Sequence, residues 1–180
     1  MIDIIANRYA EALFQLSEEE NITNVIYNEL HSVVDLVKSN KDLNNVLKSP
    51  LVPKVEKIQL IETLFNNKIN NNLKNFLKIL VEKGRISSLK SIELTFKQLL
   101  NDRDNIIEGT VISAIPLTSK KVKELEEKLS KKYNKNVTLE NKVDESILGG
   151  VLVRLGNTQI DGSVKTRLDN IKDQLSQVIS

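Results

Sequence analysis

Residues 106–115 read IIEGTVISAI and are followed by Pro116, and this stretch decides how the chain is divided. It is rich in β-branched residues and ends at a proline, which cannot donate a hydrogen bond to a sheet, so it predicts a β-strand. Glycine usage changes at the same place, because residues 1–105 contain only Gly84 and residues 106–180 contain the other glycines. We therefore predict a first domain over residues 1–105 and a second over residues 106–180.

Helical periodicity dominates the sequence before this strand. Apolar residues recur every three or four positions in successive segments that are separated by polar or turn residues. Pro50 is expected to end one helix, Pro53 to begin the next and Gly84 to cap a later one. About six helices fit into this stretch, which predicts a compact bundle.

The sequence after the strand alternates between strand and helix signals. Thr118 or Ser119 is expected to cap a helix, and further strands are predicted over residues 136–139, 150–155 and 158–160, with Gly156-Asn157 as the hairpin turn. A last helix is expected after Asp161-Gly162-Ser163. Its apolar residues are Val164, Leu168, Ile171, Leu175 and Val178. The fold class is thus mainly α, with an N-terminal six-helix bundle followed by a small α/β C-terminal domain.

Composition excludes several kinds of chemistry. The 180 residues include one His and no Cys or Trp, and 26 Lys and Arg stand against 24 Asp and Glu. Disulfides, thiolate zinc sites, thiol nucleophiles and multi-histidine metal sites are therefore excluded. A net charge of +2 gives no long-range field for nucleic acids. The N-terminus does not resemble a signal peptide and no apolar run is long enough to span a bilayer, so we expect an intracellular chain.

Most individual candidates have a structural explanation. Gly149-Gly150 precedes a strand, whereas phosphate loops lie between a strand and a helix, so we interpret these glycines as structural. His31 has no acidic or metal-binding partner in register and is interpreted as a surface or boundary histidine. Arg154 lies on the strand face opposite Val153, which favours either a solvent-facing arginine or a charge on a partner-binding surface.

Two helices carry more apolar surface than one core-facing stripe needs. In the first helix, an alanine-rich line runs beside the stripe of larger residues; the line is Ala6, Ala10 and Phe14, and the stripe is Ile5, Tyr9, Leu13 and Leu16. In the fifth helix, Ile79 and Val81 flank the main stripe. Central helices of a bundle give this pattern, and so does a groove that receives a partner helix.

Four segments resemble the delta subunit family of bacterial F-type ATP synthases, which is related to the mitochondrial oligomycin-sensitivity-conferring protein. They are residues 6–14 (ANRYAEALF), 75–85 (NFLKILVEKGR), 114–117 (AIPL) and 143–156 (VDESILGGVLVRLG), the last continuing to IDGSV at 160–164. Glu145 departs from the family, in which many members have proline. The four segments occur in the family's order and span the whole chain.

The resemblance implies a non-catalytic peripheral-stalk protein at the cytoplasmic face of the cell membrane. In the family, the N-terminal domain receives the N-terminal helix of an alpha subunit of the catalytic head, and the C-terminal domain joins the C-terminal ends of the b subunits. Rotation is thereby coupled to ATP synthesis and proton transport. In the family, a groove between the first and fifth helices receives this alpha-subunit helix. The resemblance implies that Tyr9, Ala12 and Ile79 line the same groove here, with Leu13 and Leu80 as neighbours. The resemblance implies no catalytic, cofactor-binding or metal-binding residues, and only an indirect link to the membrane.

Two other classes of function are kept as alternatives. The basic run from Lys128 to Lys135 leaves open an RNA-binding helical module, although few aromatic residues accompany it. An enzyme that uses carboxylates such as Asp144 and Asp161 is the third hypothesis, and no pattern in the sequence indicates a perturbed pKa for either group. Under the favoured interpretation, the chain has no nucleic-acid partner.

Overall fold

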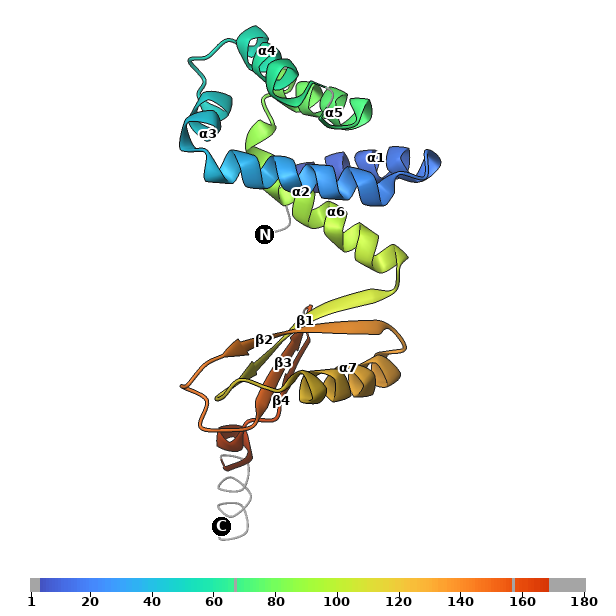
Figure 1. Ribbon diagram of the computed structural model, residues 1–180, viewed down its shortest axis with the longest axis vertical. Helices are drawn as coiled ribbons and strands as arrows, with labels where there is room; N and C mark the ends of the chain where they lie inside the picture. Colours follow the sequence, from blue (N-terminus) through green and yellow to red (C-terminus); the bar gives the residue numbers. More distant parts are fainter. Residues whose placement is uncertain (1–3, 67, 157, 169–180) are drawn as a thin grey trace. The chain divides into compact units, whose positions relative to one another are not determined.

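The chain forms two compact units, which divide between Leu100 and Asn101 (Figure 1). The computed structural model describes residues 4–66, 68–156 and 158–168. The division lies inside a helix and a few residues before the boundary predicted after residue 105, because Leu100 is the last residue that contributes a buried side chain to the helical core. The described chain is mainly helical, with a small mixed sheet in its second unit.

All the regular secondary structure among the described residues of the first unit is helical. In chain order these are α1 (Ile4–Glu19), α2 (Thr23–Ser39), α3 (Lys41–Lys48), α4 (Lys54–Phe65), α5 (Asn71–Glu82), the short 3-10 helix η1 (Ile86–Ser88) and α6 (Leu89–Arg103). Gly84 ends α5 as predicted: its φ is +66°, its amide donates to Val81, and the Arg85 amide donates to Leu80. This pair of bonds is a Schellman motif, which satisfies the last carbonyls of the helix.

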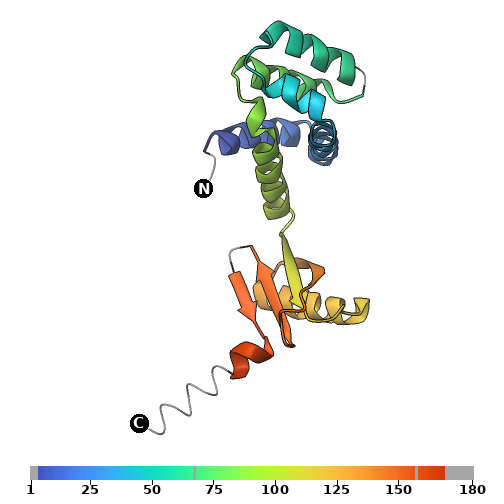
Figure 2. The same cartoon turned by 90° about the vertical axis from the view of Figure 1, so that its left-hand side faces the viewer.

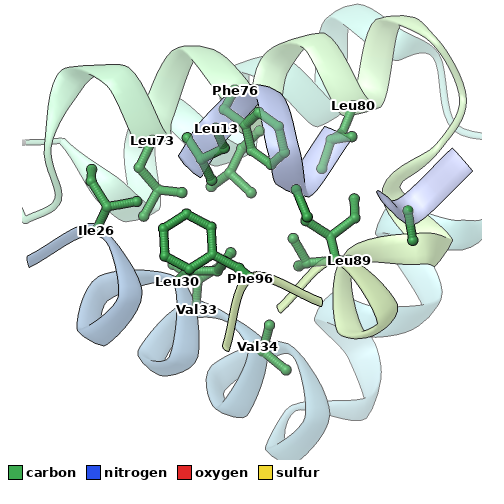
Figure 3. Close-up of a cluster of buried hydrophobic side chains, with 14 of the residues drawn as sticks. Leu13, Ile26, Leu30, Val33, Val34, Leu73, Phe76, Leu80, Leu89 and Phe96 are labelled. Atoms are coloured by element: carbon green, nitrogen blue, oxygen red, sulfur yellow. The ribbon is translucent and has the colours of Figure 1, made fainter. Parts of the chain in front are cut away.

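Side chains from α1, α2, α5 and α6 meet in one hydrophobic core (Figure 3). Phe96 of α6 lies at its centre and is fully buried. The Phe96 ring meets the ring of Phe14 edge to face at 5.3 Å and stacks on Tyr27 at 6.3 Å, both between centroids. These contacts join α6 to α1 and α2, which are distant from it in the sequence, so the core holds the first unit together.

The described residues of the second unit form a four-stranded sheet with α7 packed on it. Its elements are β1 (Ile106–Ser113), α7 (Ser119–Tyr133), β2 (Asn136–Val143), β3 (Val151–Leu155) and β4 (Thr158–Asp161), and the strand order is β2-β1-β3-β4. β1 pairs in parallel with β2 and antiparallel with β3, which pairs antiparallel with β4. The parallel pair requires a crossover, which α7 supplies.

The predicted elements of this unit occur in the predicted order, with some different ends. The Thr118 side chain caps α7, and Leu129 is buried with Val122 and Leu125 packed beside it, as expected. β2 extends beyond its predicted end at residue 139 because it pairs with β1 as far as Ser113↔Val143. Residues 164–168 are helical after Ser163, whereas Asn157 and the predicted apolar positions 171, 175 and 178 lie outside the described residues.

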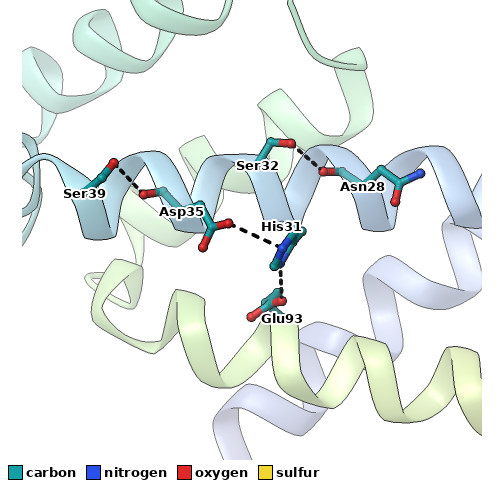
Figure 4. Close-up of polar contacts among 6 residues, drawn as sticks. All are labelled: Asn28, His31, Ser32, Asp35, Ser39 and Glu93. Carbon is teal, nitrogen blue, oxygen red and sulfur yellow. Dashed lines mark hydrogen bonds and ion pairs between the residues drawn. The ribbon is translucent and has the colours of Figure 1, made fainter. Parts of the chain in front are cut away.

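His31 has two acidic partners, so the prediction that it lacks one was wrong (Figure 4). Its Nδ1 lies 2.9 Å from Oε1 of Glu93 on α6, and its Nε2 lies 3.4 Å from Oδ2 of Asp35, one turn further along α2. The Glu93 side chain is buried while His31 and Asp35 are exposed. His31 therefore provides the hydrogen-bond partner of a buried carboxylate and links α2 to α6.

Replacing His31 with alanine should destabilise the first unit, since the buried Glu93 carboxylate then loses this partner. We expect the free energy of unfolding to fall by about 1–3 kcal/mol in chemical denaturation of the full chain. Asp35→Ala is the matched control, because its exposed ion pair with His31 should contribute at most about 0.5 kcal/mol. Equal effects of the two substitutions would show that the contact with Glu93 adds no stability.

Gly150 is expected to be intolerant of any side chain. Its φ is +81°, and a Cβ at this position would overlap with the carbonyl oxygen of Gly162. Gly150→Ala should therefore destabilise the second unit by about 3 kcal/mol, from left-handed strain and steric overlap together. Gly156→Ala is the control, since Gly156 has a φ of +53° but open space around its Cβ position. Calorimetry of both variants measures the loss of stability in each. Equal losses would contradict a contribution from steric overlap at Gly150.

Candidate functional site

α1 and α5 lie side by side, which brings the sequence-predicted contact residues into one region of the first unit. The ring of Tyr9 on α1 meets the ring of Phe76 on α5 edge to face, with centroids 6.2 Å apart. Just after the last residue of α1, Oε2 of Glu20 accepts a 2.7 Å hydrogen bond from Nδ2 of Asn72 on α5. The two helices are thus joined by an aromatic contact and a polar one.

The alanine-rich line of α1 is the side that enters the core. Ala6 and Ala10 are fully buried, and Leu13, Phe14 and Ser17 on the same helix are also buried. Small side chains on this line let the neighbouring helices approach α1 closely. The burial of the line therefore agrees with the explanation that α1 is a central helix of the bundle. The stripe of larger residues is split, since Leu13 is buried, Ile5 and Tyr9 are half-buried and Leu16 is exposed.

The five predicted contact residues fall into two groups. Tyr9 is half-buried, Ala12 is exposed and the Ile79 residue is 44% exposed, so all three can be reached from solvent. Leu13 and Leu80 are core residues (Figure 3). In this fold they cannot touch a partner directly, and they support the accessible residues from beneath. Val81, which was predicted to flank the α5 stripe with Ile79, is also buried.

We call the accessible apolar residues of these two adjacent helices the α1–α5 strip. It consists of Ile5, Tyr9, Ala12 and Leu16 of α1 and Ile79 of α5. Spacings of three and four residues place the α1 members on one face, and Ile79 lies one turn from Phe76, which contacts Tyr9. Ile5 and Leu16 were missing from the predicted contact residues because their apolar character equally fits the core.

The two carboxylates of the enzyme hypothesis stabilise local turns. Asp144 accepts hydrogen bonds from the side chain and the amide of Ser146, which lower the pKa of its carboxyl. The Ser163 amide, the Ser163 side chain and the Thr166 hydroxyl likewise lower the pKa of Asp161. A lowered pKa keeps both groups ionised, whereas a general acid at neutral pH needs a raised one. The hydrogen bonds within these turns therefore give both carboxylates a structural role, and no catalytic role is needed to account for them.

The other candidate features also carry local interactions. The ammonium group of Lys135, at the end of the basic run, lies 3.8 Å from Oδ1 of Asp102, and Lys132 lies 5.6 Å from the ring centre of Tyr133. Arg154 donates to its cross-strand neighbour Gln159. Within the described ranges, no group of three or more His, Asp or Glu side chains is arranged to hold a metal ion. None of the described helices has the length and apolarity needed to cross a membrane.

Comparison with known proteins assigns the family. The family model described as ATP synthase delta (OSCP) subunit matches residues 5–175. ATP synthase subunit delta of Clostridioides difficile (strain 630) is 62% identical over 181 residues, which cover 100% of both chains. ATP synthase subunit delta of Alkaliphilus metalliredigens (strain QYMF) is 39% identical, with 99% of each chain covered.

Solved structures show the same fold. A chain of the Toxoplasma gondii mitochondrial ATP synthase hexamer superposes with a TM-score of 0.71 at 23% identity, over 96% of this chain and 98% of that one. A chain of the Polytomella F-ATP synthase matches 53% of this chain and 84% of its own length, with a TM-score of 0.51 and 21% identity. The RNA-binding alternative finds no support in these comparisons. From the sequence match over nearly its whole length, the chain belongs to the ATP synthase delta (OSCP) subunit family.

Proposed function

We propose that this chain is the stator subunit delta of an F-type ATP synthase, where it links the catalytic head to the b subunits of the peripheral stalk. The observation that carries this proposal is the full-length similarity to proteins named ATP synthase subunit delta. Its role there is structural and not catalytic. The chain would lie at the cytoplasmic face of the cell membrane and be attached to the membrane only through the complex.

The first unit is the part that we assign to the catalytic head. In this proposal α1 to α6 act together as a six-helix bundle, and the α1–α5 strip receives the N-terminal helix of an alpha subunit. The exposed Ile79 beside the Tyr9–Phe76 contact supports this placement, because an apolar strip on two adjacent helices suits the apolar face of a third. Leu13 and Leu80 hold the strip in place from the core.

The physical task of such a joint is to resist torque without sliding. Burying apolar surface contributes about 25 cal/mol per Å², and it acts without long-range charge, so salt screens it little. The partner helix must be ordered on binding, which costs about 2–5 kcal/mol and sets a lower limit on the area that the joint has to bury. Rigid support beneath the strip reduces the further cost of ordering this chain.

The second unit is the part that we assign to the b subunits. It has its own hydrophobic core between the sheet and α7, so it can provide a second binding surface without drawing on the helical core. Two separately built units let one chain hold two different partners. Rotation of the central shaft would then be coupled to ATP synthesis and proton transport because the head is prevented from turning with it.

The strip can be tested with the full chain and a synthetic peptide that copies the N-terminal segment of the alpha subunit from the same organism. Ile79→Asp should weaken binding by at least about tenfold, because a carboxylate must be desolvated where an aliphatic group was buried. Leu36→Asp is the matched control, since Leu36 of α2 is 41% exposed against 44% for Ile79. Isothermal titration calorimetry measures both affinities, and circular dichroism confirms that both variants fold.

Two results would contradict the placement of this joint. If Ile79→Asp binds the alpha peptide as tightly as the original chain, the partner lies elsewhere on the first unit. If the original chain does not bind the peptide at micromolar concentration, the proposed contact with the N-terminal helix of the alpha subunit is wrong.

A further inference from the structure

A pocket of about 120 Å³ lies in the first unit and includes no residue of the α1–α5 strip. Its lining comes from the second half of α2, from α3, from η1 and from the first residues of α6. α3 lies against α2 and η1, and η1 leads directly into α6 (Figure 2). Two stretches of sequence, residues 34–48 and 86–90, thus form one pocket.

Aliphatic side chains form the walls of this pocket. Val34 and Leu89 are buried members of the helical core, and Val37 and Ile86 pack against that core. An apolar cavity of about 150 Å³ can hold a benzene ring. The pocket is slightly smaller but reaches the surface, since the lysines in its lining are exposed, so a planar ring can enter it edge first.

Asn44 of α3 brings an unsatisfied acceptor to the pocket. Its Oδ1 is buried, and no donor bonds to it among the residues that the structure describes. A buried amide oxygen without a partner costs free energy, so a missing partner is one explanation for it. The terminal torsion of an asparagine side chain is soft, so the amide can turn this oxygen toward a donor that enters the pocket. A ligand with an N–H group would restore the hydrogen bond.

Three lysines from three helices also line the pocket. They are Lys38 of α2, Lys48 of α3 and Lys90 of α6, and all three are exposed. In the described part of the chain, none of them forms an ion pair and no acidic residue belongs to the lining. Unpaired cations around an apolar pocket favour an anionic ligand.

Two classes of anion fit the walls and the lysines. A fatty acid would place its chain in the pocket and its carboxylate at the lysines, but it has no donor for Asn44. A nucleotide supplies a planar base with N–H donors, and its phosphates supply the charge. Adenine suits asparagine in particular, because its N6 amino group can donate to Oδ1 while its N7 accepts from Nδ2.

We propose that this pocket binds an adenine nucleotide, with the edge of the base at Asn44 and the phosphates at Lys38, Lys48 and Lys90. The inference goes beyond the stator function and does not depend on it, because the site lies within the first unit alone. A ligand that contacts α2, α3 and α6 together stabilises their packing as its occupancy rises. The supply of nucleotide would therefore adjust the stability of the first unit.

The test measures binding of ADP to the full chain by isothermal titration calorimetry. ADP should bind with a Kd below about 1 mM, and its affinity should fall as the salt concentration rises. Adenosine lacks the phosphates, and inosine diphosphate has an oxygen in place of the N6 amino group. Each should therefore bind at least about tenfold more weakly than ADP. Octanoate represents the fatty acids.

Two kinds of variant place the ligand in the pocket. Asn44→Leu should weaken ADP binding by at least about tenfold, while the melting temperature of the free chain stays the same or rises, because an unpaired buried oxygen is removed. Asn45→Leu is its matched control, since this exposed neighbour does not line the pocket. Lys48→Ala with Lys90→Ala should weaken ADP binding and flatten its salt dependence. Lys41→Ala, at an exposed lysine of α3 outside the lining, is the control for this pair.

Each outcome supports or overturns the site and leaves the stator function standing. Weaker ADP binding by Asn44→Leu and by the lysine pair, with both controls unchanged, supports the site. Absence of ADP binding to the original chain at about 1 mM overturns it. Equal ADP affinity in every variant overturns the pocket as the binding site. Binding of octanoate without binding of ADP overturns the proposed ligand, and a lower melting temperature of Asn44→Leu overturns the assignment of its oxygen to a ligand.

Discussion

The close packing of α1 through two alanines is the constraint on which the first unit depends. Ala6 and Ala10 are fully buried, so the backbone of α1 lies nearer to its neighbours than a larger side chain would allow. This placement lets Phe14 reach Phe96 and turns Tyr9 toward Phe76. The α1–α5 strip is therefore a consequence of core packing. Because Ala6 and Ala10 face the core, the apolar residues on the neighbouring side of α1 remain accessible from solvent.

A comparable constraint acts in the second unit, where close backbone contact takes the place of helix packing. A Cβ on Gly109 of β1 would overlap with the backbone carbonyl oxygen of Arg154 in β3 as well as with the Leu155 side chain, and since the backbone cannot yield, this position requires glycine. Gly150 likewise lets the segment before β3 lie against Gly162. Beside this contact, the Val164 amide donates to the Gly149 carbonyl, which fixes the segment before β3 to the start of the helical residues 164–168.

Local patterns predicted the elements, and contacts between distant segments account for the differences. Gly84 and Thr118 were correctly predicted as caps because capping depends on neighbouring residues alone. Asp35, one turn from His31, could have been recognised from the sequence, whereas Glu93 is 62 positions away and could not. Ile79 and Leu80 are equally apolar neighbours, and only the packed bundle shows that Ile79 is exposed and Leu80 is buried.

The two surfaces differ in a way that suits a chain with two joints. Exposed charges beside the α1–α5 strip have both signs, with Arg8 near Glu11 and Lys83 next to Glu82. In the second unit, the concave surface beside α7 has three cations in its lining, Lys121, Lys128 and Arg167, against one acid, Glu124. If both joints take amphipathic helices, apolar burial alone would let each surface accept either partner. A cationic border favours an acidic partner over a basic one and gives it no comparable advantage at the strip, so charge can distinguish the two surfaces while apolar area supplies the affinity.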